Sequence, residues 1–172
     1  MRRVLPILCV LACICVPVSL AAKAETPQQP LAEAMLHWAD PQIGTVLAAG
    51  VMGPSAEEFD PQGRLTRGDL ASALEAWGHP MAPPADPGVL VSVRELDARL
   101  VTALGLQPPA RAIRIAARDA GLAPVSSLGT ETVARLLGLR TNHPAAQDAL
   151  ELLPGQPVTR AETAFSLAQA MG

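Results

Sequence analysis

Apolar residues recur every three or four positions from residue 31 onward, the spacing that gathers them on one face of an α-helix. Glycine follows most of these stretches, and hydroxyl, acidic or proline residues precede them, as is usual at the ends and starts of helices. No stretch alternates convincingly between apolar and polar residues, as a half-buried strand does. The pattern therefore predicts an all-α fold, a bundle of about seven short helices. The expected helices are 40–50, 66–78, 92–105, 109–121, 130–138, one that begins at 142 and one that begins at 159.

Three of these helices begin with the same motif, a hydroxyl residue followed three positions later by an acid. This is the spacing of a capping box, in which the two residues satisfy each other's backbone amides. The pairs are Thr66 with Asp69, Ser92 with Glu95, and Thr159 with Glu162. Residues 65–74 and 158–167 align around the motif without a gap, and 91–100 is a looser copy, so the chain contains an internal repeat. A proline-rich linker, 79–90, follows the first copy.

The first 24 residues have the pattern of a secretory signal peptide, with a basic start, an apolar stretch over 4–21 and the small-x-small tripeptide Ala22-Lys23-Ala24. A membrane span is the alternative, but the unbroken apolar run, 7–16, is only ten residues, whereas a span takes about 20. A lipoprotein signal at Cys13 is the lesser alternative, because the motif before that cysteine is only approximate. We therefore expect a secreted bacterial protein with no membrane span in the mature chain.

Removal of that segment changes the composition of the 172-residue chain. All three cysteines and the single lysine lie within the first 24 residues. The remaining 148 residues hold ten arginines against all sixteen acids, so their formal charge is −6, compared with −3 for the whole chain. Disulfide scaffolds and cysteine-ligated metal sites are excluded. A broadly basic surface for nucleic acid is excluded as well.

The first repeat carries a longer series of motif residues. In order they are Trp38-Ala39, Ile43, Leu47, Gly50, Gly53, Phe59, Pro61, Thr66-Arg67 and Asp69. Their order and spacing over residues 36–78 resemble an S-layer homology repeat, so the first repeat is assigned to 31–78. Residues 91–172 resemble two degenerate repeats of the same family. In the second, formed by 113–122 and 129–137, Thr130-Glu131 stands where the family has Thr-Arg, and the third keeps Thr159-Arg160.

The resemblance implies three repeats that pack as a helical, roughly trigonal unit and bind anionic polysaccharide attached to peptidoglycan. It implies a non-catalytic module at the bacterial cell wall, without a cofactor. A second hypothesis keeps the same fold: the chain is a protein-interaction or regulatory region, N-terminal in a longer relative, associated with a secreted cell-wall hydrolase.

Arg67 and Arg160 occupy the first position of their helices, where a cation forfeits roughly 0.3–1 kcal/mol against the helix dipole. A helix N-terminus with free amides and a guanidinium is an anion receptor. With the resemblance, this makes both residues candidate polysaccharide contacts, although each has an alternative partner in a nearby acid or carbonyl. Arg94, one position later in its helix, is a weaker candidate. Trp38 is a candidate to stack on a sugar ring, with core packing as the alternative.

Signals for catalysis are weak. His37, His79 and His143 are scattered and belong to no zinc-protease or triad motif. The chain also has no phosphate-binding glycine loop and no carboxylate pair in an apolar context. We therefore expect a protein that is not an enzyme and holds no metal. A small metal-dependent hydrolase that uses the histidines is the third and least supported hypothesis.

Overall fold

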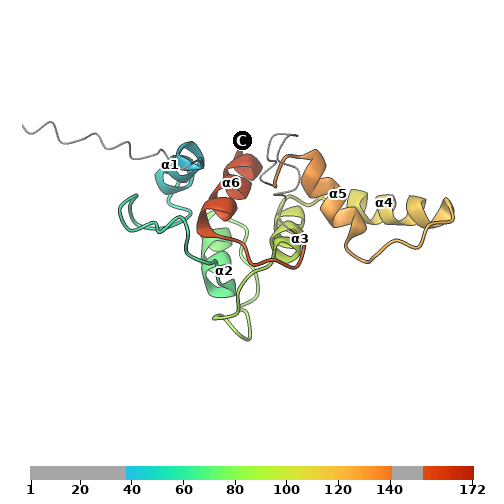
Figure 1. Cartoon of the computed structure of the whole chain (residues 1–172), viewed down its shortest axis with the longest axis horizontal. Coiled ribbons are helices and arrows are strands. Elements are labelled where there is room, and N and C mark those ends of the chain that lie inside the picture. Colours follow the sequence, from blue (N-terminus) through green and yellow to red (C-terminus); the bar gives the residue numbers. More distant parts are fainter. Residues whose placement is uncertain (1–37, 141–152) are drawn as a thin grey trace, which may run out of the picture. The chain divides into compact units, whose positions relative to one another are not determined.

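The computed structural model describes residues 38–140 and 153–172 (Figure 1). In this part of the chain it is helical and has no strand, which confirms the all-α prediction. The helices are α1 (Asp40–Ala48), α2 (Arg67–Ala76), α3 (Val93–Ala103), α4 (Gln107–Asp119), α5 (Leu128–Leu136) and α6 (Arg160–Met171). The expected signal peptide and the helix expected from residue 142 lie outside the described residues.

The hydroxyl residues that precede α2, α3 and α6 cap these helices as predicted. Thr66 and Thr159 each accept a hydrogen bond from the amide three positions later, and the acid there binds the cap amide in return, so both capping boxes are complete. Ser92 accepts the bond from the amide of Glu95 (3.3 Å). Each cap contributes about 1 kcal/mol to helix stability.

The segments that lead into α2, α3 and α6 form a closed ring of backbone hydrogen bonds. The amide of Leu65 donates to the carbonyl of Val158 (3.1 Å), and the amide of Val158 donates to Val91 (2.9 Å). The amide of Val91 donates to Leu65 (2.9 Å), which closes the ring. All three side chains are buried. The copies at 65–74, 91–100 and 158–167 are therefore related by a pseudo-threefold axis through this central ring.

Each of the three helices also donates its first two amides to the next copy around the ring. In α2, the amide of Arg67 donates to Val89 and the amide of Gly68 donates to Pro87, both at 2.9 Å. The equivalent bonds join Val93 to Gln156 and Arg94 to Pro154 for α3, and Arg160 to Gly63 and Ala161 to Pro61 for α6. The first amides of a helix have no partner within the helix, so this arrangement satisfies them with the proline-containing segment of a neighbouring copy.

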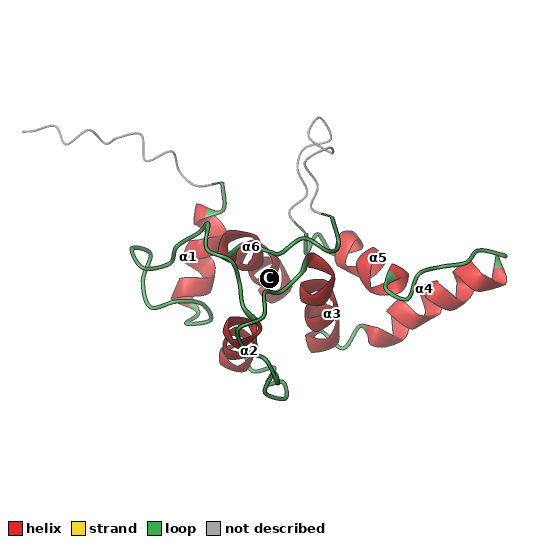
Figure 2. Ribbon diagram, turned by 60° about the horizontal axis from the view of Figure 1, so that its bottom comes forward, coloured by secondary structure: helices red, strands yellow, loops and turns green. Residues whose placement is uncertain are grey.

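α1 and α5 are similar in their packing against a helix that begins at the central ring. α1 precedes α2 in the sequence and packs on α6, whereas α5 precedes α6 and packs on α3 (Figure 2). Both end in the same turn, with Gly50 and Gly138 at positive φ. The next residues make matching backbone bonds, Val51 to Val46 and Leu139 to Ala134, each 2.9 Å. α4 is additional to this pattern and packs on α5.

This arrangement corrects the expected position of the second Thr-Arg motif. Thr130 was expected to open a helix in that role, but it is the third residue of α5 and takes no part in the central ring. Ser92 precedes α3 at the ring instead. The reason lies in the preceding residues: the segment before Ser92 is extended and ends in Val91, whereas the residues before Thr130 already turn into α5.

An ion pair lies buried between α5 and α3. The Nε of Arg140 donates to Oδ2 of Asp97 at 2.8 Å, and both side chains are at most 5% exposed. Burial raises the pKa of Asp97 above its usual range, although the hydrogen bond from Arg140 acts in the opposite direction. The helical pattern of the sequence carries no signal for this pair.

Candidate functional site

A groove of about 360 Å³ lies where the first and third copies meet. One wall is the turn that follows α1, residues 50–53, and the other is the face of α2 that carries Asp69, Ser72, Ala73 and Ala76. Arg160, the first residue of α6, lies along it. The groove thus combines backbone, one carboxylate, one hydroxyl and one guanidinium, which are groups that bind hydroxylated and anionic ligands.

Phe59 holds the Arg160 side chain in position. The Nε of Arg160 donates to the carbonyl of Phe59 at 2.6 Å, and the guanidinium carbon lies 5.0 Å from the centre of the Phe59 ring. This distance is within the range of a cation–π interaction. The Phe59 side chain is itself fully buried, so it is a rigid support. The backbone bond uses only Nε, which leaves the two terminal nitrogens of the guanidinium to other contacts.

Gly53 allows the backbone to approach this guanidinium. Its φ is +72°, a backbone conformation that residues other than glycine rarely adopt. A Cβ at this position would lie 3.4 Å from the Phe59 ring and 3.5 Å from Nη2 of Arg160. A larger side chain would therefore narrow the groove beside the cation.

The position of Arg160 differs in the other two copies. Arg67 occupies the equivalent position in the first copy, but its Nε and Nη2 bind Glu95 at 2.8 and 3.1 Å. The hydrogen bond to Glu95 raises the pKa of Arg67. Val93 takes this position in the second copy and has no charge. Within the described residues Arg160 has no carboxylate at ion-pair distance, so of the two arginines at this position it is the one without an ion-pair partner.

The remaining candidates lie outside this groove. Arg94 is more than half exposed and its Nε lies 3.4 Å from Glu131. Trp38 is half-exposed, and its ring centre lies 6.0 Å from that of Phe165 in α6. Of the four candidate residues, the structure brings Arg160 alone into the groove.

The helix amides expected to receive an anion are not available. In α2 and α6 the first two amides donate to carbonyls of the neighbouring copy. The third donates to the capping threonine, at 3.2 Å in α2 and 3.1 Å in α6. The expectation of free amides was therefore wrong. The packing of the three copies that positions these helix N-termini also gives their amides hydrogen-bond acceptors in the neighbouring copy. An anion here must be bound by side chains.

No histidine cluster is found in the described residues. His79 packs against the ring of Trp77, with ring centres 4.4 Å apart, and His37 and His143 lie outside the described residues. A search of residues 38–140 and 153–172 finds no group of three or more His, Cys, Asp or Glu side chains able to hold a metal ion. None of the helices described there has the length and apolar content to cross a membrane.

The turn after α1 and Asp69, which line the groove, lie within a segment that is recognised by comparison with known families. Residues 35–71 match the S-layer homology domain. The resemblance predicted from the motif is thereby confirmed for this segment, about a fifth of the chain. S-layer homology domains are non-catalytic modules that bind secondary cell-wall polysaccharides and so anchor proteins at the cell surface. A comparison with curated proteins finds no match.

The sequence predicted Arg160 as a candidate contact, but it did not predict the groups that support the guanidinium. Gly53 and Phe59 were identified as motif residues, yet their roles depend on Arg160, which is 101 residues from Phe59 in the chain. The repeat alignment gives one usable signal. The alignment shows the Thr-Arg pair in the first and last copies. Three copies that form a closed ring necessarily place the last copy beside the first, so the last Arg is expected near the first copy.

Proposed function

We propose that the chain is a non-catalytic, secreted module that binds anionic polysaccharide of the bacterial cell wall through the groove beside Arg160. One observation carries this proposal. The S-layer homology segment forms one wall and part of the other wall of a groove whose guanidinium is supported by Phe59 and makes no ion pair with an acid in the described residues. Guanidinium groups bind carboxylate and phosphate through charge-assisted hydrogen bonds.

The three copies differ in ways that favour one principal groove. Binding at Arg67 requires its bidentate bond to Glu95 to be broken, and Val93 offers no charge. Arg94 is likewise held near Glu131. Arg67 and Arg94 are therefore proposed as secondary contacts. Trp38, half-exposed beside α6, is proposed as a surface on which a sugar ring stacks.

The overall charge of the chain supports short-range recognition. A net charge of −3, or −6 after loss of the first 24 residues, repels a polyanion at long range. Binding then depends on the local geometry of the groove. We therefore expect affinity to fall steeply when Arg160 is replaced, because no general positive field compensates for its loss.

The test is sedimentation of the purified chain with isolated bacterial walls, before and after chemical removal of the accessory polysaccharide. We expect sedimentation to depend on the polysaccharide and to fall at least tenfold in Arg160→Gln, about the loss of one charge-assisted contact. Arg118→Gln is the matched control, because it removes the same charge from an exposed position of α4. Equal sedimentation of wild type and Arg160→Gln would contradict the proposed groove.

A protein-interaction role, the second hypothesis, is favoured by one separate observation. Several large apolar side chains of the α4–α5 region are more than half exposed: Ile115, Leu122, Val125 and Leu136. Large apolar side chains that are exposed on one face are typical of interaction sites. Co-purification with a secreted wall hydrolase, without affinity for walls alone, would support this role in place of polysaccharide binding.

A further inference from the structure

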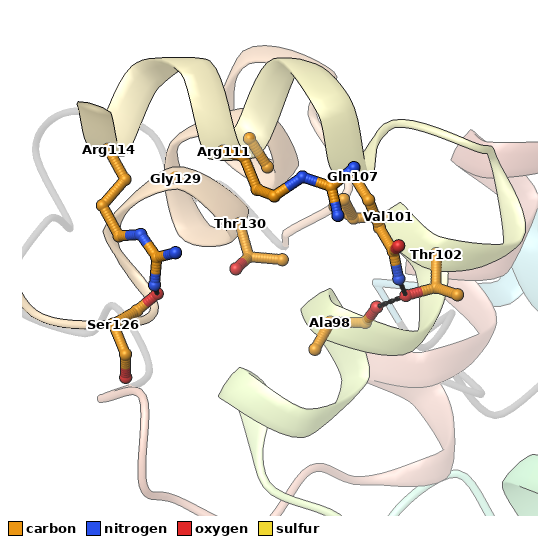
Figure 3. Close-up of a pocket in the computed structure, with 10 residues that line it drawn as sticks. Ala98, Val101, Thr102, Gln107, Arg111, Arg114, Ser126, Gly129 and Thr130 are labelled. Carbon is orange, nitrogen blue, oxygen red and sulfur yellow. Dashed lines mark hydrogen bonds between the residues drawn. The ribbon is translucent and has the colours of Figure 1, made fainter. Parts of the chain in front are cut away.

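A second pocket lies outside the repeat pattern, where the additional helix α4 meets α3 and the start of α5 (Figure 3). Its volume is about 300 Å³. Two arginines of α4, Arg111 and Arg114, line it, and none of its lining residues is an acid. In a chain whose acids outnumber its basic residues, a pocket with two cations and no carboxylate is a marked local concentration of positive charge.

The polar groups of this pocket are arranged around one central space. Arg114 points toward Ser126 and Arg111 toward Gln107, with Thr130 between them (Figure 3). The Nη1 of Arg114 lies 3.4 Å from the carbonyl of Ser126, which is a long hydrogen bond. Its Nε is buried and has no hydrogen-bond partner among the described residues. A buried donor without a partner is costly, and an acceptor bound in the pocket would remove that cost.

The opposite side of the pocket is the N-terminus of α5, which differs from those of α2 and α6. Ser127 makes no side-chain capping bond. Gly129 and Thr130 line the pocket, and their backbone amides have no acceptor in the described part of the chain, whereas the first amides of α2 and α6 are all taken. The positive end of a helix therefore faces the same space as the two guanidiniums.

We propose that this pocket binds a compact oxyanion, the carboxylate or phosphate group of a small molecule or of the end of a polymer. The anion lies between Arg111 and Arg114 and accepts from both, from the Thr130 hydroxyl and from the α5 amides. The lining side chains of Ala98, Val101 and Ala110 are apolar. They leave room for a small organic group attached to the anion. This site is separate from the groove beside Arg160 and does not depend on the proposed function.

The test is titration of the purified full chain with inorganic phosphate and, separately, with N-acetylalanine, at constant ionic strength, while the NMR shifts of the Gly129 and Thr130 amides are followed. We expect saturable shifts of these two amides with at least one probe. A response to phosphate alone assigns a phosphate ligand, a response to N-acetylalanine alone assigns a carboxylate ligand, and a response to both supports a general oxyanion site.

Two variants report on the pocket and one serves as the matched control. Arg111→Gln changes an exposed residue and Thr130→Val removes a hydroxyl but no charge, so both are expected to keep the fold. Each should weaken binding about tenfold, the loss of one hydrogen bond to a charged group. Arg118→Gln removes a charge from the same helix outside the pocket and should leave binding within about twofold.

Three results would overturn the proposal. They are the absence of saturable shifts with either probe, an equal effect of Arg118→Gln and Arg111→Gln, and unchanged binding in both pocket variants. The second result would indicate general charge attraction rather than a site. Arg160→Gln should leave the shifts unchanged, so failure of this proposal is distinguishable from failure of the proposed wall-binding groove.

Discussion

The backbones of α4 and α5 approach each other closely at Gly129, and this contact allows a quantitative prediction. A Cβ at position 129 would lie 1.8 Å from the carbonyl oxygen of Ala110 and 2.6 Å from its carbonyl carbon. Ordinary contact begins near 3.4 Å, so Gly129→Ala forces the two helices about 1.5 Å apart. Both sides of this contact are backbone, and no side-chain rotamer is able to relieve it.

The expected magnitude follows from two opposing effects. Overpacking of this kind costs about 1–3 kcal/mol, and a contact between backbones belongs at the upper end. The better helix propensity of alanine offsets up to about 1 kcal/mol of that cost. We therefore expect Gly129→Ala to lower the free energy of unfolding by about 2 kcal/mol. Ala110 is the one buried residue of α4, so detachment of α4 is the local way to relieve the contact.

The assay is urea denaturation combined with hydrogen exchange of residues 107–119. We expect a lower midpoint, and faster exchange in α4 than in α6. Gly44→Ala in α1 is the matched control, because a Cβ there has nothing within 4 Å. It should stabilise the protein by about 0.5–1 kcal/mol. The reasoning is refuted if the two alanine substitutions change stability in the same direction by similar amounts.

Four further substitutions have expected outcomes. Arg140→Met leaves the Asp97 carboxylate buried without its main partner and should cost about 3–5 kcal/mol in urea unfolding, whereas adding Asp97→Leu should recover most of that loss. Thr159→Ala removes an α6 cap and should cost about 1 kcal/mol by the same measurement. Gly53→Ala strains a residue at positive φ and narrows the groove. Sedimentation with walls should therefore fall more in Gly53→Ala than in Thr159→Ala. Arg67→Gln breaks a partly exposed ion pair and should change stability by less than about 1 kcal/mol, with little effect on sedimentation.

The features that the sequence predicted well are those determined by neighbouring residues. The caps at Thr66, Ser92 and Thr159 depend on a hydroxyl and an amide three positions apart, so a pattern of single residues is enough to identify them. The S-layer homology segment was recognised for a similar reason, because its motif residues lie within one repeat.

Features that join distant segments could not be derived in this way. The contact of Arg160 with Phe59, the buried pair of Arg140 with Asp97 and the central ring all link residues far apart in the chain. Thr130 was expected to open a helix, but it is the third residue of α5, and Ser92 is the residue that pairs at the central ring. Ser92 differs from Thr130 because the residues just before it are extended and pair with the two other copies. A sequence pattern within one copy does not reveal this pairing.

The central ring also means that single copies cannot be separated from the protein without loss of structure. The first copy completes its helix start with carbonyls of the second, the second with those of the third, and the third with those of the first. The last of these bonds cannot form until the chain has been synthesised to Arg160 and Ala161. Folding of the ring is therefore expected to wait until the third copy has been synthesised, with no copy stable alone. A fusion tag cut from residues 35–71 would carry the turn after α1 and Asp69, but it would lack the rest of the α2 wall, the backbone bonds from the other copies, and Arg160.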